Sequence, residues 1–174
     1  MTSQAISVLP AARSQSFQEV LGFIEPPSEF LEKPELQRFA RQASQRAISG
    51  FSDQHALRII RQGISSRILN PLSTYLEVGK GELAVILDLD RTTVHRRADK
   101  DLPLPRHSAE GVLRLLELKD LACETFESEE AALRWLRRAH PLLEGESPLE
   151  AASTSFGSRR VRNMLIAIQY GGVV

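Results

Sequence analysis

Residues 83–97 read LAVILDLDRTTVHRR, a run in which an apolar helical turn and a short acidic break precede hydroxyl and cationic side chains. Such polar side chains donate hydrogen bonds to phosphates and base edges, as the second helix of a helix-turn-helix does in the major groove of DNA. Val94 is expected to face back towards the core. The pattern therefore predicts a DNA-binding helix-turn-helix over about residues 80–98. Its candidate DNA-binding residues are Arg91, Thr92, Thr93, His95, Arg96 and Arg97.

The first helix and the turn of this motif have their own requirements. Leu83, Ala84 and Leu87 supply the apolar packing face, and alanine is small enough for a close helix crossing. The turn commonly holds glycine because one residue takes a positive φ, and aspartate, here Asp88, tolerates that conformation better than most residues. Asp90 is suited to cap the second helix. The alternative interpretation is an ordinary helical hairpin whose arginines form a solvated face.

The charge balance limits how the chain binds DNA. Its 174 residues carry 22 basic and 22 acidic side chains, so the net charge is zero and a highly basic nucleic-acid coat is excluded. Contact must come from a local patch, such as the six arginines between residues 38 and 67, or from two copies of a patch. Because one neutral monomer offers few phosphate contacts, we predict a homodimer that places two copies of Arg91–Arg97 in successive major grooves.

Other features argue against several classes of protein. The four histidines show neither i,i+4 pairing nor neighbouring cysteines, and the sequence lacks a glycine-rich phosphate loop and a nucleophile elbow, so we expect no enzyme, no cofactor and no metal. The single cysteine, Cys123, excludes an internal disulfide, and both Cys123 and Trp135 are expected to be buried. No apolar run approaches the roughly 20 residues that span a bilayer, and the first residues lack a signal-peptide pattern. We expect a cytoplasmic protein without a membrane partner.

Hydrophobic periodicity predicts an all-α fold. Residues 1–27 are rich in serine, glutamine and small residues and end in two prolines, so we expect a flexible N-terminal arm. Apolar residues then recur at helical spacing, and no segment alternates with period two. The predicted helices span residues 35–48, 52–63, 64–76, 80–87, 91–98 and 108–126. We assign residues 28–125 to a helical domain that contains the helix-turn-helix.

The C-terminal third, residues 126–174, carries explicit signals for where helices begin. Ser128 is expected to cap one helix. The sequence SPLE at 147–150 is a capping box with proline at the first helical position, so a short helix begins there. Thr154 or Ser155 then caps a final helix. This third is predicted to form a small helical domain.

Four segments of this third resemble the toxin-binding domain of antitoxins of the Xre/MbcA/ParS type. They are AALRWL at 131–136, SPLE at 147–150, residues 157–161 and residues 168–171. The preceding helix-turn-helix and long helix are similar to the Xre-like half of the same proteins, so the resemblance covers roughly residues 52–174. The chain departs from the family's pattern at His140, Glu144 and Ala167, where the family often has asparagine, glycine and arginine. Each departure bears on which toxin is recognised.

The resemblance implies a type II antitoxin. Such proteins pair with a RES-domain toxin, an enzyme that degrades NAD, and block it by covering its active site, while the helix-turn-helix represses the shared operon. The expected architecture is a helix-turn-helix DNA-binding bundle followed by a small helical toxin-binding domain. The alternative is a dimeric transcriptional repressor with no toxin partner.

The end of the chain supplies candidate toxin-binding residues. Glycines after the last helix let the backbone turn sharply and approach another surface, and the valines beyond them with the terminal carboxylate form an apolar, anionic plug suited to a nucleotide cleft. Two arginines one turn apart could hold acidic groups at the rim, and a tyrosine could stack at its mouth. Alternatively, the arginines form a solvated face and the tyrosine and valines complete the domain's own core. The candidates are Arg159, Arg162, Tyr170, Gly171, Gly172, Val173 and Val174.

Overall fold

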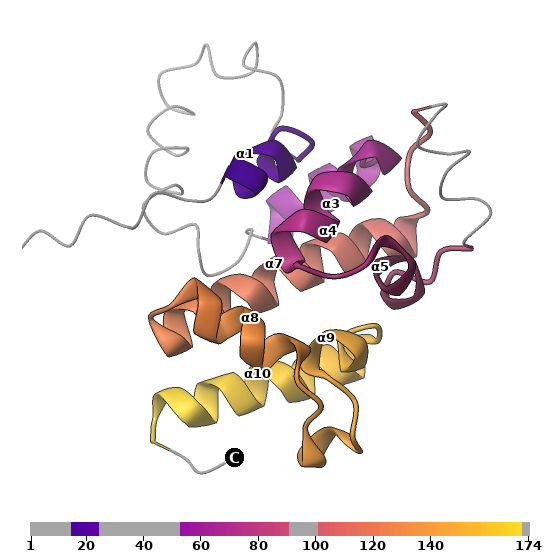
Figure 1. The fold of residues 1–174 in the computed structure, drawn as a ribbon. Helices are drawn as coiled ribbons and strands as arrows, with labels where there is room; N and C mark the ends of the chain where they lie inside the picture. Colours follow the sequence, from indigo (N-terminus) through magenta and orange to yellow (C-terminus); the bar gives the residue numbers. More distant parts are fainter. Residues whose placement is uncertain (1–14, 25–52, 91–100, 172–174) are drawn as a thin grey trace, which may run out of the picture.

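The computed structural model describes residues 15–24, 53–90 and 101–171, and their regular structure is helical (Figure 1). This confirms the predicted all-α class. In chain order the elements are α1 (Gln15–Leu21), α3 (Asp53–Gln62), η2 (Ser66–Ile68), α4 (Leu69–Leu76), α5 (Lys80–Ile86), α7 (Arg106–Phe126), α8 (Glu129–Arg137), η3 (Pro141–Leu143), α9 (Pro148–Ala151) and α10 (Ser155–Gln169). None of the described helices combines the length and apolarity needed to cross a lipid bilayer. The helices predicted at 35–48 and 91–98 lie outside the described residues.

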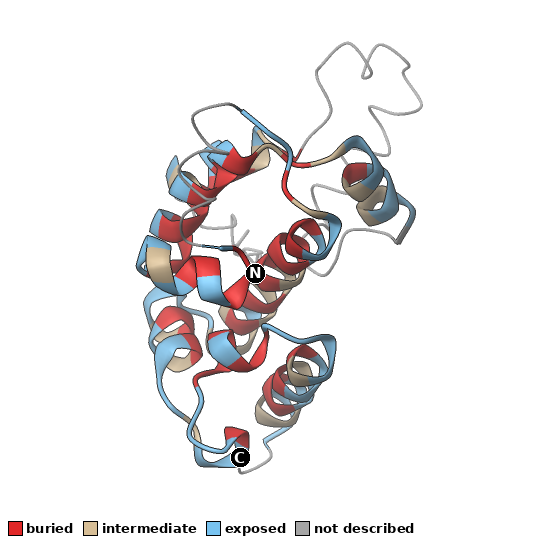
Figure 2. Cartoon of the chain, turned by 90° about the vertical axis from the view of Figure 1, so that its right-hand side faces the viewer, coloured by how far each residue is buried: buried red, intermediate tan, exposed pale blue. Residues whose placement is uncertain are grey.

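The long helix α7 organises the fold. Figure 1 shows it between α3, α4 and α5 on one side and α8, α9 and α10 on the other, and in Figure 2 the buried residues of these helices face the interior. Val112, Leu115 and Leu118 of α7 are completely buried. A single hydrophobic cluster extends from α4 and α5 across α7 to α10, which gives both halves of the chain a common core. A domain boundary near residue 125, where α7 ends, stays a prediction.

Helix α1 differs from the flexible arm expected over residues 1–27. Phe17 and Val20 of α1 and Ile24 in the turn after it are 5%, 0% and 4% exposed, and the ring centroid of Phe17 lies 5.2 Å from that of Tyr75 in α4. Three apolar side chains on one face are enough to dock a short helix, although serine and glutamine dominate the surrounding composition. The rest of the expected arm, residues 1–14 and 25–27, lies outside the described residues.

The structure also divides the helix predicted over residues 64–76. The amide of Leu104 donates to the carbonyl of Ile64 at 2.7 Å, and the amide of Ser66 donates to the carbonyl of Leu102 at 3.0 Å. These bonds form an isolated antiparallel bridge that keeps the chain extended before η2 begins. The prediction was wrong here because a distant segment, and not the local sequence, determines the backbone conformation.

Candidate functional site

The turn after α5 is the first part of the predicted DNA-binding motif. Asp88 has a φ of 51°, the left-handed conformation predicted for it. The amide of Leu89 donates to the carbonyl of Ala84 at 2.8 Å and closes the end of the helix. Leu83, Ala84 and Leu87 are buried, as expected for the packing face. The backbone therefore turns where a helix-turn-helix needs it to turn.

Helix α7 holds this turn in place. The buried hydroxyl of Ser108 donates to the carbonyl of Leu87 at 2.8 Å, and Nε2 of His107 lies 3.2 Å from the carbonyl oxygen of Asp88. Gly111 permits a close approach, since a Cβ at this position would lie 2.8 Å from a methyl carbon of Leu87. The end of α5 is thereby fixed on the long helix.

The segment after the predicted second helix is anchored on the other side of the motif. The Asp101 carboxylate accepts a hydrogen bond from the hydroxyl of Ser65 and pairs with the guanidinium of Arg67 at 3.4 Å. The bond from the Leu104 amide to the Ile64 carbonyl holds the chain just before α7. The backbone is therefore secured on both sides of residues 91–100.

The candidate DNA-binding residues themselves lie outside the described residues. They are Arg91, Thr92, Thr93, His95, Arg96 and Arg97. Their contacts with DNA stay predictions. The structure shows the frame of this segment, which is the anchored chain on both of its sides.

In the C-terminal third, side chains cap the helices as predicted. The hydroxyl oxygen of Ser128 accepts from the amide of Ala131 at 3.3 Å at the start of α8. At the start of α9, Ser147 Oγ accepts from the amide of Glu150 at 3.2 Å, while a Glu150 carboxylate oxygen accepts from the Ser147 amide at 2.8 Å. The backbone and hydroxyl donors of Ser147 lower the pKa of the Glu150 carboxyl. Both helix starts are set by local sequence.

Helix α10 begins in close contact with α9. Thr154 Oγ1 accepts from the amide of Gly157 at 3.0 Å, so Thr154 and not Ser155 is the cap. A Cβ at Gly157 would lie 1.8 Å from the carbonyl oxygen of Ala151, a distance that no side chain tolerates. This glycine therefore sets how closely α9 and α10 approach.

The end of α10 projects into solvent. Tyr170 is 87% exposed, which excludes the alternative in which this side chain completes the domain's own core. Gly171 has a φ of 75° and turns the chain away from the helix. The remaining candidates of this segment, Gly172, Val173 and Val174, lie outside the described residues. Tyr170 is thus available to a partner.

The two candidate arginines of α10 have different surroundings. Nη2 of Arg162 lies 2.9 Å from a carboxylate oxygen of Glu117 in α7, so its acidic partner belongs to the same chain. The Arg159 guanidinium lies 5.1 Å from the centre of the Phe156 ring, and Phe156 is 73% exposed. The sequence analysis missed Phe156, although an aromatic residue on the polar face of a capped helix was a signal for it. Both arginines border the same groove, but only Arg162 has an acidic partner within the described residues.

Comparison with known proteins assigns both halves of the chain. A family model described as the antitoxin Xre/MbcA/ParS C-terminal toxin-binding domain matches residues 121–171, and one described as the antitoxin Xre-like helix-turn-helix domain matches residues 55–117. The chain belongs to the Xre/MbcA/ParS antitoxin family. The resemblance drawn from its motifs is confirmed. The helix-turn-helix domain implies DNA binding, and the toxin-binding domain implies a toxin partner.

A curated relative of the antitoxin comes from Sphingobium sp. (strain YBL2) and is named "Prs ADP-ribosylating antitoxin". The two sequences are 29% identical over 122 residues, which cover 65% of this chain and 77% of the relative. The similarity therefore extends over most of the relative's length.

A buried lysine joins the two domains of the antitoxin. Lys119 lies between the two matched ranges and is completely buried. Its Nζ donates to the carbonyl of Tyr75 at 2.7 Å and to a carboxylate oxygen of Glu129 at 2.6 Å, and it lies 3.2 Å from the centre of the Tyr75 ring. Burial lowers the pKa of Lys119, and the Glu129 carboxylate acts in the opposite direction. The lysine thus ties α4 and α8 to α7.

Two further side chains pack near this junction. Trp135 packs against the core with its ring 5.7 Å from that of Phe126, although it is partly exposed. Cys123 is partly buried, and this burial raises the pKa of its thiol to about 11, which suits a packing role. In the part of the chain that the structure describes, no three histidine, cysteine, aspartate or glutamate side chains gather to hold a metal ion.

Proposed function

We propose that this antitoxin binds a RES-domain toxin that consumes NAD and inhibits it by covering the active site with the end of α10. We also propose that the antitoxin represses its own operon as a homodimer and acts in the cytoplasm. It inhibits the toxin by binding alone and catalyses no reaction. The observation that carries the toxin-binding part is the exposure of Tyr170 at the end of a helix in the matched toxin-binding domain.

The name of the Sphingobium relative connects that protein with a reaction that uses NAD. That name mentions ADP-ribosylation. Since ADP-ribosyl groups are donated by NAD, an ADP-ribosylating toxin and an NAD-hydrolysing toxin both release nicotinamide. Nicotinamide release therefore tests the proposal under either reaction.

The toxin experiment uses the full-length antitoxin and the protein that copurifies with it from its neighbouring gene. The wild type is expected to abolish nicotinamide release by that protein. Deletion of residues 170–174 should weaken inhibition by at least about tenfold, because the segment that covers the active site is lost. The melting temperature and operator binding of this variant should stay near those of the wild type, since Tyr170 is exposed. Full inhibition by the deletion variant would move the blocking surface elsewhere.

Removing the whole C-terminal third is a poorer test. Leu118 on α7 and Leu136 on α8 are completely buried in the common core. A fragment that ends near Phe126 would expose this core, so its failure to inhibit would also follow from unfolding. Point variants and the short deletion avoid that ambiguity.

The DNA part of the proposal rests on the frame around residues 91–100. Replacing Arg96 with alanine is expected to cost about 1–3 kcal/mol of operator binding if it reads a guanine, and to weaken all sequences similarly if it holds a phosphate. Binding should show the steep salt dependence of paired phosphate contacts. Unchanged operator binding by a folded Thr93→Ala, Arg96→Ala double variant would refute the assignment, and a monomer bound at one half-site would refute the dimer.

A further inference from the structure

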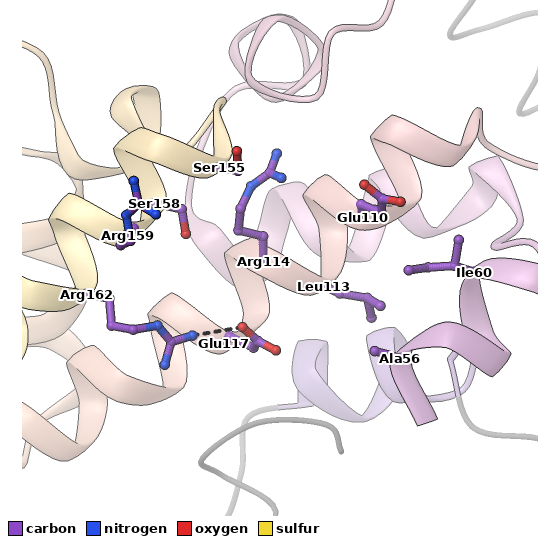
Figure 3. Close-up of a pocket in the computed structure, with 10 residues that line it drawn as sticks. All are labelled: Ala56, Ile60, Glu110, Leu113, Arg114, Glu117, Ser155, Ser158, Arg159 and Arg162. Atoms are coloured by element: carbon purple, nitrogen blue, oxygen red, sulfur yellow. Dashed lines mark hydrogen bonds and ion pairs between the residues drawn. The ribbon is translucent and has the colours of Figure 1, made fainter. Parts of the chain in front are cut away.

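A shallow groove lies beside the N-terminal end of α10, away from the helix end considered above. Its volume is about 320 Å³, and it is bounded by α3, α7 and α10 (Figure 3). Ala56, Ile60 and Leu113 give it an apolar side, and Ser155, Ser158 and Arg159 give it a polar side. Phe156, which projects into solvent, stands next to this polar side in the sequence. The groove therefore combines apolar contact with hydrogen-bond donors.

Most of the charges around the groove are already matched within the chain. Arg162 pairs with Glu117 at 2.9 Å. Arg114 donates from Nε to the carbonyl of Ala152 at 2.9 Å, and the nearby Glu110 and Glu117 carboxylates oppose the lowering of its pKa by burial. These groups form a fixed wall.

Arg159 and Ser158 differ from that wall. Within the described residues Arg159 has no acidic partner, and its guanidinium lies over the ring of Phe156. Ser158 is only 7% exposed and lines the same groove (Figure 3), and a serine hydroxyl can donate a hydrogen bond to an anion there.

The charges near the groove indicate whether the expected ligand is an anion or a cation. From residue 151 to residue 174 the sequence contains three arginines and no aspartate or glutamate. The groove also meets the N-terminal end of α10, where the helix dipole favours negative charge. Both features favour an anion.

We propose that this groove receives an aspartate or glutamate side chain of the toxin. Its carboxylate accepts a hydrogen bond from the Ser158 hydroxyl and pairs with Arg159, while Phe156 packs into an apolar depression on the toxin. This inference rests on the proposed toxin partner, and it adds a second contact surface some distance along α10 from Tyr170. Aromatic and arginine side chains are the residues that most often dominate binding energy at interfaces.

The test measures the affinity of full-length antitoxin variants for the copurifying toxin by calorimetry. Arg159→Glu should weaken binding by at least about tenfold, because an attraction becomes a repulsion. Arg160→Glu is the matched control, since Arg160 is an exposed neighbour that does not line the groove, and it should change the affinity by less than about threefold. Phe156→Ala should also weaken binding at least about tenfold, whereas Leu142→Ala, at an exposed apolar position outside the groove, should not.

Ser158→Ala separates binding from folding. Its removal should leave the melting temperature near that of the wild type, while toxin affinity falls several-fold because the hydrogen bond to the toxin carboxylate is lost. A structural role for Ser158 would instead lower the melting temperature. Charge reversal of the contacted acidic residue on the toxin should restore binding to Arg159→Glu.

The outcomes separate this inference from the proposed function. If the wild type neither binds nor inhibits the copurifying protein, the proposed function fails. If the wild type inhibits and Arg159→Glu, Ser158→Ala and Phe156→Ala bind as tightly as it does, the groove is not a contact and this inference is overturned. It is equally overturned if Arg159→Glu loses affinity for operator DNA and keeps its affinity for the toxin.

Discussion

The two halves of this antitoxin establish their helices in different ways. In the toxin-binding half, a side chain caps the start of each of α8, η3, α9 and α10. In the helix-turn-helix half, Ser65 caps η2 in the same way, but α4, α5 and α7 begin without a side-chain cap. There, long-range bonds fix the ends of helices: Ser108 donates to the carbonyl of Leu87, and Lys119 donates to the carbonyl of Tyr75. Local caps therefore define the helix starts of the toxin-binding half, whereas the longer helices of the other half depend more on packing.

The largest effect is expected at the most crowded contact of the locally specified half. Gly157→Ala should destabilise the protein by about 3 kcal/mol or more, because the new Cβ would lie 1.8 Å from the backbone oxygen of Ala151 and α10 would have to move. Gly79→Ala is the control: nothing lies within 4 Å of its Cβ position, so the free energy of unfolding should change by no more than about 1 kcal/mol, the effect of alanine at a helix N-cap. Equal urea denaturation midpoints for the two variants would contradict this prediction.

The next effect concerns the lysine between the halves. Lys119→Met keeps the length of the side chain but removes charged hydrogen bonds to Tyr75 and Glu129, so we expect a loss of about 2 kcal/mol. Glu129→Gln should cost less, since the Glu129 side chain is 49% exposed and water can replace part of its interaction. Thermal unfolding of both variants checks the order, and the reverse order would show that the carboxylate matters more than the buried amine.

A pair of serine variants tests the comparison directly. Ser147→Ala removes a local cap and should cost about 1 kcal/mol, with faster amide exchange confined to α9. Ser108→Ala leaves the buried carbonyl of Leu87 without its donor and should cost a similar amount, on the order of 1 kcal/mol. Here the faster exchange should appear around Leu87 and Asp88, far away in the sequence. Exchange that rises near residue 108 alone would contradict the idea that packing fixes this turn.

The smallest perturbation is a labelling experiment that leaves the fold intact. Burial raises the pKa of Cys123 from 9.0 to about 11, so at pH 8 its thiolate fraction should be about a hundredfold below that of the unfolded chain. Iodoacetamide should therefore label the native antitoxin far more slowly than the urea-unfolded protein. Equal rates would indicate that the junction around α7 opens readily.

The comparison also explains which features could be predicted from the sequence. The capping box at 147–150 and the left-handed Asp88 are properties of short segments, so residue types and spacing were sufficient. The bridge that divides the predicted 64–76 helix joins segments nearly forty residues apart in the sequence. The hydrophobic periodicity of one segment cannot indicate such a long-range contact. Lys119 was missed because a lysine on an amphipathic helix normally reaches solvent, and only the fold shows its partners.

The candidate toxin-binding residues also differ in how well the sequence predicts them. The sequence indicated Tyr170 at the end of the last helix, and the structure leaves this side chain exposed. Arg162 looked equally available, but its guanidinium lies 2.9 Å from the carboxylate of Glu117 in α7, so the arginine already has an acidic partner. Whether a surface arginine is paired within its own chain depends on which helices pack together, which composition does not reveal.

The frame around residues 91–100 has a consequence for how such antitoxins diversify. Its anchors, the Ser108 bond to Leu87 and the Asp101 contacts with Ser65 and Arg67, all lie outside that segment. Substitutions at the polar positions of this segment therefore leave in place the bonds that hold the chain on both sides of it. Under the proposed function, one copy of a duplicated gene can therefore acquire a new operator while it still neutralises the old toxin, so regulatory circuits can separate before toxin pairs do.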